Sequence, residues 1–238
     1  MLDNSLGEAH TSLAFSLDLF DWDWDSAERE YRRALQLSPG YATAHQWYAS
    51  HLAVLGRNEE AIVELKKAAS LDPLSLIISA DTADILLVAH RFDDSIKESG
   101  KTIEMDPRFP VAHFQLGQAY AQKRNFERSI EEIQKAIGFS GGNITFTSNL
   151  AYIYAMSGEK KKAIDLLAGL MNPSGHGFSN ASEIALVYVG LGDNDQAMIW
   201  LEKGFDQRFN PSILRRPCFD PLRSDPRFQD LMRRIGLQ

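Results

Sequence analysis

The feature of this sequence that most constrains its fold is a recurrence of small residues every 34 positions. One column of small residues, with every step equal to 34, is formed by Ala27, Ala61, Ser95, Ser129, Ala163 and Ala197. A second, whose first step is 35 and whose other steps are 34, is formed by Ala14, Ala49, Ala83, Gly117, Ala151 and Ala185. Two such columns with one period are very improbable at average residue usage. The chain is therefore expected to consist of repeated structural units.

Each unit is interpreted as two amphipathic helices separated by a tight turn. In the second unit we expect helices over residues 44–55 and 59–71, joined by Gly56 and Arg57. Glycine ends a helix cheaply because it accepts left-handed backbone angles. Pro39, Pro73 and Pro107, again 34 apart, close the early units, because proline cannot continue a helix. Alternating apolar and polar runs are absent, which argues against strands.

The two columns of small residues predict where the paired helices cross. Two helices approach to about 8–10 Å only when the side chains at their crossing are small. A single hairpin cannot bury its apolar face, so neighbouring units are expected to stack into an all-α superhelix. We predict six units, at about 6–39, 40–73, 74–107, 108–141, 142–178 and 179–205, within a repeat domain of residues 1–205.

Residues 206–238 break the period and are predicted to form a C-terminal capping segment. Proline-containing turns are expected at Asn210, Arg216 and Asp220, followed by a helix with Pro226 at its first position. A superhelix needs an atypical last unit to cover its exposed core. From residue 211 onward the segment holds six Arg against three Asp, which leaves two interpretations, a solvated face or a basic contact surface.

The 34-residue unit, with small residues at both crossings and a closing proline, resembles the tetratricopeptide repeat (TPR) family over about residues 6–205. The resemblance implies a right-handed α-solenoid whose first helices line a concave, peptide-binding groove. His90 and Arg124 depart from the family pattern, because they replace the turn glycine in the third and fourth units. The groove positions carried over by register are Gln46, Trp47, Ser50, Asp81, Asp84, Phe114, Gln115, Gln118, Gln122, Asn149 and Tyr152.

These groove residues are amides, carboxylates and aromatics. Amides can pair with the backbone of an extended peptide, and aromatic rings offer large contact areas. The basic cluster with which chaperone-binding members of the family hold a carboxylate is replaced here by Gln46, Ser50, Asp81 and Asp84. Such a groove is expected to favour a neutral or basic protein segment. Each residue alone remains open to interpretation as plain surface.

A narrower resemblance is carried by residues 21–35, 41–48 and 219–231. These segments are similar to the C-terminal TPR regions of bacterial multidomain regulators, which are winged-helix transcriptional regulators or serine/threonine kinases. The resemblance implies a sensory or dimerisation tail, with a homodimer as one arrangement. The sequence itself contains neither a glycine-rich phosphate loop nor a set of kinase catalytic motifs.

Two features of the sequence suggest metal binding. The Asp-Trp-Asp-Trp-Asp run at 21–25 resembles the start of a calcium loop, but Ser26 and Arg32 stand where that loop needs Gly and Glu. We interpret the run as a surface turn that absorbs the extra residue of the first step, with Asp25 capping the next helix. His10, His45 and His113 share one register and are interpreted as interface residues, with a metal site as the alternative.

Cys218, the single cysteine, has no predictable base beside it. We therefore predict no enzyme activity, no metal and no cofactor. The net charge of −7 disfavours nucleic acid, and no basic leader or long apolar run is present, so a membrane partner is not expected and the protein is predicted to be cytoplasmic. Residues 172–179 are interpreted as a tolerated surface loop, with a gate over the groove as the alternative.

Overall fold

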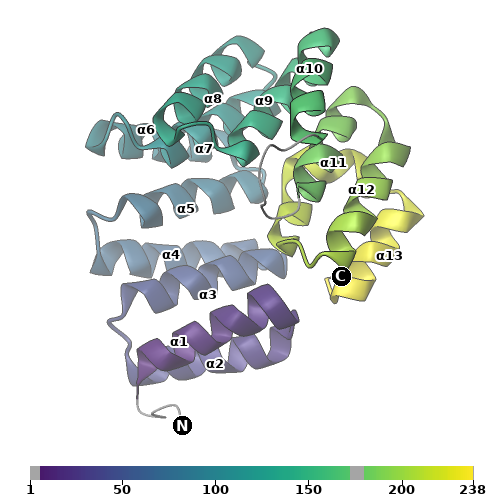
Figure 1. Ribbon diagram of the computed structural model, residues 1–238. Helices are drawn as coiled ribbons and strands as arrows, with labels where there is room; N and C mark the ends of the chain where they lie inside the picture. The colour runs from purple at the N-terminus through teal and green to yellow at the C-terminus, as the bar shows by residue number, and fades with distance from the viewer. Residues whose placement is uncertain (1–5, 172–179, 238) are drawn as a thin grey trace.

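The computed structural model describes residues 6–171 and 180–237. This part of the chain is helical, contains no strand, and curves into a superhelix of stacked helix pairs (Figure 1). None of its helices is both long and apolar enough to cross a lipid bilayer. The elements are α1 (Gly7–Ser16), η1 (Leu17–Asp21), α2 (Trp24–Leu37), α3 (Ala42–Val54), α4 (Asn58–Leu71), α5 (Leu76–Val88), α6 (Phe92–Met105), α7 (Pro110–Gln122), α8 (Phe126–Ser140), α9 (Ile144–Met156), α10 (Lys160–Met171), α11 (Ala181–Leu191), α12 (Asn194–Asp206), η2 (Pro211–Arg215), η3 (Pro217–Leu222) and α13 (Pro226–Ile235).

The small residues of the two columns lie at the contacts between paired helices. Ala61 and Ala197 are fully buried, and a Cβ atom on Gly117 would lie 2.7 Å from the side chain of Ile133. In the third and fourth units a serine replaces alanine and adds a hydrogen bond. The hydroxyl of Ser95 donates to the carbonyl of Ala83, and that of Ser129 to Gly117, both at 2.7 Å. These crossings are therefore tied together as well as close-packed.

The turns between paired helices share one backbone conformation, whether or not a glycine is present. Gly56, with a φ of 81°, ends its helix in the left-handed region, as predicted. His90 and Arg124 adopt the same region, with φ values of 59° and 58°. A non-glycine residue there costs about 1–2 kcal/mol. Contacts accompany both exceptions, since His90 lies 3.6 Å from Asp220 and Arg124 lies over the ring of Phe126.

The extra residue of the first unit is absorbed differently from our prediction. It does not sit in the surface turn alone, because α1 continues into the π-helix η1, and Trp22 then adopts a φ of 56°. A π-helical turn is the usual way for a helix to accommodate one inserted residue. The prediction that Asp25 caps the next helix is wrong. Asp23 is the cap of α2, and its carboxylate accepts from the backbone N–H of Ser26 at 3.1 Å.

The C-terminal segment returns toward the concave side of the superhelix. Its turns form η2 and η3, and α13 begins at Pro226 with Asp225 as the N-cap. α13 packs on α12, whereas η3 contacts α11 and η2 reaches α3 (Figure 1). The segment is firmly anchored, because Phe219, Leu222 and Leu231 are fully buried.

The two ends of the superhelix also meet. Trp22 packs against Phe205 and Phe209, with ring centroids 5.6 and 6.4 Å apart. The indole of Trp24 donates a hydrogen bond to the carbonyl of Ile235. The run at residues 21–25 therefore joins the first unit to the last elements of the described chain.

Candidate binding groove

The residues predicted to line the groove lie on α3, α5, α7 and α9, the inner helices of the second to fifth units. They differ in how much solvent reaches them. Ser50 is exposed, and Trp47, Asp81, Asp84 and Gln122 are half-buried. The others are buried: Gln46, Phe114, Gln115, Gln118, Asn149 and Tyr152. The structure therefore brings them to one side of the superhelix without presenting them as an open strip, and their contact with a partner stays a prediction.

Residues of the C-terminal segment of the chain itself contact the inner helices. The guanidinium of Arg216 donates to Asp84 on α5 at 2.9 Å and to Gln118 on α7 at 3.0 Å. Gln118 in turn donates to Gln115 at 3.1 Å. Arg215 donates from Nε to the carbonyl of Val54, at the C-terminal end of α3, at 2.7 Å. Burial lowers the pKa of Arg215, and the nearby charge of Arg223 acts in the same direction.

A second polar contact joins α3 to α5. The amide of Gln46 donates to the carboxylate of Asp81 at 2.6 Å. Burial raises the pKa of Asp81 to about 6, although the hydrogen bond from Gln46 acts against this, and the nearby charge of Asp84 raises it further. Because Asp81 becomes protonated below about pH 6, the negative charge that α5 contributes to the groove is reduced there.

The aromatic residues pack in pairs along the same side. The ring of Trp47 lies 4.6 Å from that of Phe15 on α1, and the rings of Phe114 and Phe146 stack at 4.4 Å. Tyr152 packs against Gly190, where a Cβ atom would lie 2.9 Å from its ring. Of these aromatics, Trp47 and Phe15 offer the more accessible surface to a partner.

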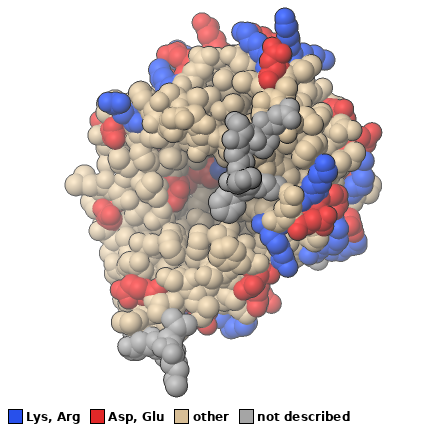
Figure 2. Space-filling model, in the orientation of Figure 1, with Lys and Arg blue, Asp and Glu red and all other residues tan. Residues whose placement is uncertain are grey.

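The described residues leave hollows between the inner helices and the C-terminal segment, and two of them are lined by predicted groove residues from several helices. The first, which we call the N-terminal hollow, has a volume of about 240 Å³ and is lined by residues that include Phe15, Asp18, Trp47, Ser50, His51, Asp84, Arg215 and Arg216. The second, of about 430 Å³, is lined by residues that include Phe114, Asn149, Ser182, Arg208, Ser212 and Arg216. Figure 2 shows a recess at the centre of this face, with acidic atoms inside it. Residues 172–179, the candidate gate, lie outside the described residues.

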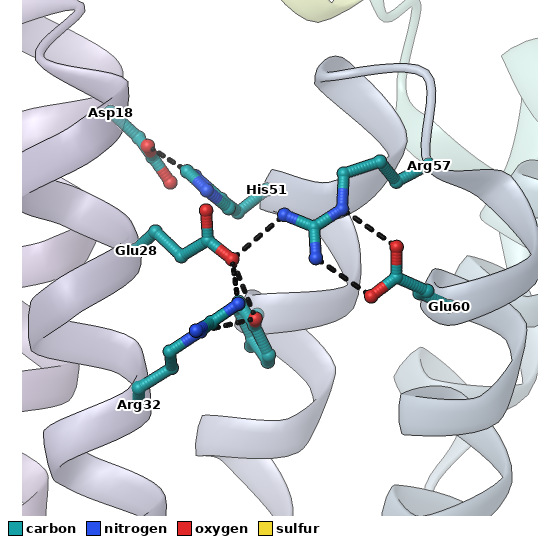
Figure 3. Close-up of polar contacts among 7 residues, drawn as sticks. Asp18, Glu28, Arg32, His51, Arg57 and Glu60 are labelled. Atoms are coloured by element: carbon teal, nitrogen blue, oxygen red, sulfur yellow. Dashed lines mark hydrogen bonds and ion pairs between the residues drawn. The ribbon is translucent and has the colours of Figure 1, made fainter.

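His51, which is not one of the predicted groove positions, lines the N-terminal hollow. Its side chain is fully buried, and its Nδ1 lies 2.8 Å from a carboxylate oxygen of Asp18 on η1 (Figure 3). Its Nε2 is buried with no hydrogen-bond partner. Burial raises the pKa of Asp18, although hydrogen bonding and charge interaction with His51 oppose this. No sequence signal identified this pair, because Asp18 lies in the π-helical turn η1, which the sequence did not predict.

Beside His51, a network of charged groups joins the first unit to the second (Figure 3). Glu28 on α2 lies 2.7 Å from both Arg32 and Arg57, and accepts from the hydroxyl of Tyr48 at 3.0 Å. Arg57 also bonds Glu60 at 2.7 Å. Burial acts to raise the pKa of Glu28, but the hydrogen bonds from Arg57 and Tyr48 outweigh it and lower that pKa. The network is a structural tie between units.

The three histidines of common register are used within the fold. His45 and His113 each engage a glutamate through Nδ1 at 2.6 Å, and the carbonyl of the preceding boundary proline through Nε2 at 3.0 Å. His10 lies 2.5 Å from Glu30. With both ring nitrogens occupied, His45 and His113 have no lone pair free for a metal. Residues 6–171 and 180–237 contain no group of three His, Cys, Asp or Glu side chains suited to hold one.

Cys218 lies beneath the groove, almost fully buried. Burial raises the pKa of its thiol to about 12. A thiol in this environment stays protonated at neutral pH and is a weak nucleophile.

The architecture and the sequence define one class of protein. Residues 23–78 and 81–144 each match the tetratricopeptide repeat family, and together the two matches span half of the chain. The chain belongs to this family. No curated protein sequence matches it significantly.

The chain is similar in fold to several solved structures. It matches a chain of the APC/C hetero-tetramer Cut9–Hcn1 with a TM-score of 0.66 and 17% identity, covering 98% of this chain and 43% of that one. It matches PilW, a type IV pilus biogenesis factor, with a TM-score of 0.64 and 16% identity, covering 95% and 98%. It matches PilF of Pseudomonas aeruginosa with a TM-score of 0.60 and 15% identity, covering 96% and 97%. At these identities the likeness is one of fold.

Proposed function

We propose that this protein is a non-enzymatic scaffold that binds a protein or peptide segment on the concave side of its superhelix. TPR scaffolds generally mediate contacts between proteins. The observation that carries the proposal here is the N-terminal hollow, in which an accessible aromatic pair, Phe15 and Trp47, adjoins polar groups. Concave sites with apolar walls and a few convergent polar groups are the usual form of binding sites.

The ligand of this scaffold is a neutral or basic segment. Asp81 and Asp84 lie on the inner helix α5, and Arg216 neutralises only the second of them by direct contact. The chain outside residues 211–238 carries a formal charge of −10, which favours the approach of a positively charged partner. We propose a cytoplasmic location for this interaction, with no nucleic acid or membrane as the partner.

The proposal is tested by site-directed photo-crosslinking in a lysate of the source organism. A benzophenone amino acid replaces Trp47 on the inner helix α3, and in a matched variant it replaces Val63, which is half-exposed on the outer helix α4. Proteins crosslinked from position 47 and not from position 63 would establish a groove partner. Equal products from both positions, or none from position 47, would refute the concave side as the binding surface.

A second candidate function is that of a sensory or dimerisation tail in a larger bacterial regulator. It is favoured by one observation: segments that carry the narrower sequence resemblance, residues 21–35 and 219–231, belong to the two ends that meet through Trp24 and the C-terminal elements. Whether the chain belongs to a larger regulator is tested by searching the complete reading frame in the source genome for a winged-helix or kinase domain. Sedimentation equilibrium of the purified protein tests dimerisation, since a dimeric tail predicts twice the 26.7 kDa mass of the chain.

A further inference from the structure

The N-terminal hollow has apolar walls that solvent can reach. The apolar residues of its lining that are exposed or half-buried are Phe15, Leu19, Trp24, Trp47, Val54 and Val88. Phe15 is the most exposed of them, at 40%, and its ring lies 4.6 Å from that of Trp47. Contiguous apolar surface that stays open to water marks sites of contact with other molecules. The hollow therefore presents the surface that an apolar group would cover.

The charged side chains of the hollow balance one another. Its two carboxylates, those of Asp18 and Asp84, are matched by the two guanidinium groups of Arg215 and Arg216. Asp84 pairs with Arg216 at 2.9 Å, and Asp18 lies 2.8 Å from His51. Arg215 donates to a backbone carbonyl at the end of α3. Because an ion that entered would have to displace one of these contacts, the charge pattern fits an uncharged group.

The size of the hollow limits that group to one side chain. Its volume is about 240 Å³. An apolar protein cavity of about 150 Å³ holds benzene, so this hollow has room for one aromatic ring of a partner but not for a folded element. Phe15, Trp24 and Trp47 offer rings for the offset and edge-to-face contacts that aromatic pairs prefer.

The walls of the hollow come from both ends of the repeat array. Phe15 lies on α1, Trp47 on α3 and Val88 on α5, and Pro211 and Arg215 of η2 complete the lining. Pro211 is buried, and Arg215 is bonded to α3 at 2.7 Å, so the C-terminal wall is held in place. A site formed before the partner arrives loses less conformational entropy on binding.

We propose that the N-terminal hollow binds one aromatic side chain of the partner segment. The inserted ring contacts Phe15 and Trp47, and it leaves the ion pair of Asp84 with Arg216 intact. This inference rests on the proposed scaffold function and names the side chain that the scaffold selects.

The test begins with a phage-displayed library of random 12-residue peptides selected on the intact protein. We expect enrichment of peptides that share one Phe, Tyr or Trp position. In fluorescence anisotropy with a selected peptide, replacement of that residue by alanine is expected to weaken binding about tenfold or more. The loss should be the same at low and at high salt, because burial of an uncharged ring is not screened by ions.

A variant that fills the hollow locates the bound ring. Ser50 is exposed and lines the hollow, so Ser50→Trp occupies the space without replacing a buried residue. Ser70→Trp on the outer helix α4 is the matched control, since Ser70 is also exposed and its hydroxyl, like that of Ser50, bonds a backbone carbonyl of its own helix. We expect Ser50→Trp to weaken peptide binding about tenfold and Ser70→Trp to leave it unchanged, with circular dichroism to verify that both variants are folded.

The outcomes separate this inference from the scaffold function. Enriched peptides that share a basic, acidic or aliphatic position, or no position at all, would overturn the inference and leave the scaffold function standing. A loss on alanine replacement that shrinks at high salt would do the same, because it would reveal a charged contact. Binding to Ser50→Trp as tight as to the wild type would place the peptide elsewhere and overturn the inference too. Failure to select any peptide would count against both.

Discussion

The indole Nε1 of Trp24 donates a hydrogen bond of 2.8 Å to the backbone carbonyl of Ile235, which is 211 residues further along the chain. We expect Trp24→Phe to keep most of the apolar contact but to leave that carbonyl without its donor, lowering the free energy of unfolding by about 1 kcal/mol. Urea unfolding followed by circular dichroism measures the change. Trp200→Phe, at a similarly half-buried indole on α12, is the matched control.

Hydrogen exchange separates this contact from a purely local effect. If Trp24 joins the two ends of the superhelix, Trp24→Phe should speed exchange in α13 as well as in α2. A change confined to α2 would show that the ends are held together by other contacts, such as those of Trp22.

Gly117→Ala is expected to destabilise the fourth unit. Alanine is the better helix former by about 1 kcal/mol, but its Cβ would lie 2.7 Å from the fully buried side chain of Ile133. Overpacking of this kind costs about 1–3 kcal/mol, so we expect a net loss. Gly138→Ala on α8 is the control, because nothing lies within 4 Å of its Cβ position, and it should stabilise the protein by up to about 1 kcal/mol. Thermal unfolding of the two variants would contradict the crossing argument if both gained stability.

Asp81→Asn should change the dependence of stability on pH. In the folded chain the pKa of Asp81 is raised from 3.8 to about 6, so the folded state binds this proton more tightly than the unfolded chain does. The wild type therefore loses stability as pH rises from about 4 to 6, and asparagine, which keeps an oxygen for Gln46, does not. We expect the variant to be more stable by on the order of 2 kcal/mol at pH 7 and nearly equal at pH 4. Urea titrations at the two pH values that show the same difference would contradict the assignment.

The contact between Arg216 and Asp84 is expected to appear as a coupling free energy. Their side chains are 21% and 25% exposed, so solvent screens the pair only in part. We expect Arg216→Met and Asp84→Asn each to destabilise the protein, and the double variant to lose about 1 kcal/mol less than the sum of the two. Additive losses in this double-mutant cycle, measured by urea unfolding, would mean that Arg216 acts through Gln118 or through packing.

The repeat architecture was predictable because its contacts are local. Residues such as Ala61 and Gly117 meet partners within their own helix pair, so a 34-residue period identifies them directly. The helices expected at residues 44–55 and 59–71 are observed as Ala42–Val54 and Asn58–Leu71. The left-handed turns at His90 and Arg124 follow the same period although neither residue is glycine.

The lining of the groove was predictable only in part, because its exposure depends on contacts over long sequence distances. The repeat register places Gln118 and Asp84 on inner helices, but Arg216, which covers both, lies 98 and 132 residues away from them. The Arg-Pro step at residue 216 predicted a turn, but it did not predict that this turn would contact the inner helices. The pairing of His51 with Asp18 was hidden for a similar reason, since it follows from the π-helical turn of η1.

The junction of Trp24 with Ile235 also has an evolutionary consequence. Repeat arrays commonly grow and shrink by duplication or loss of whole units, because each unit contacts only its neighbours. Here the unit that holds Trp24 contacts α13. Each unit between them contributes its own increment of rotation and rise along the superhelix. One unit more or fewer would carry α13 away from Trp24, so closure restricts how many units can be gained or lost. Divergence in this lineage should therefore proceed by substitution within units, while their number stays constant.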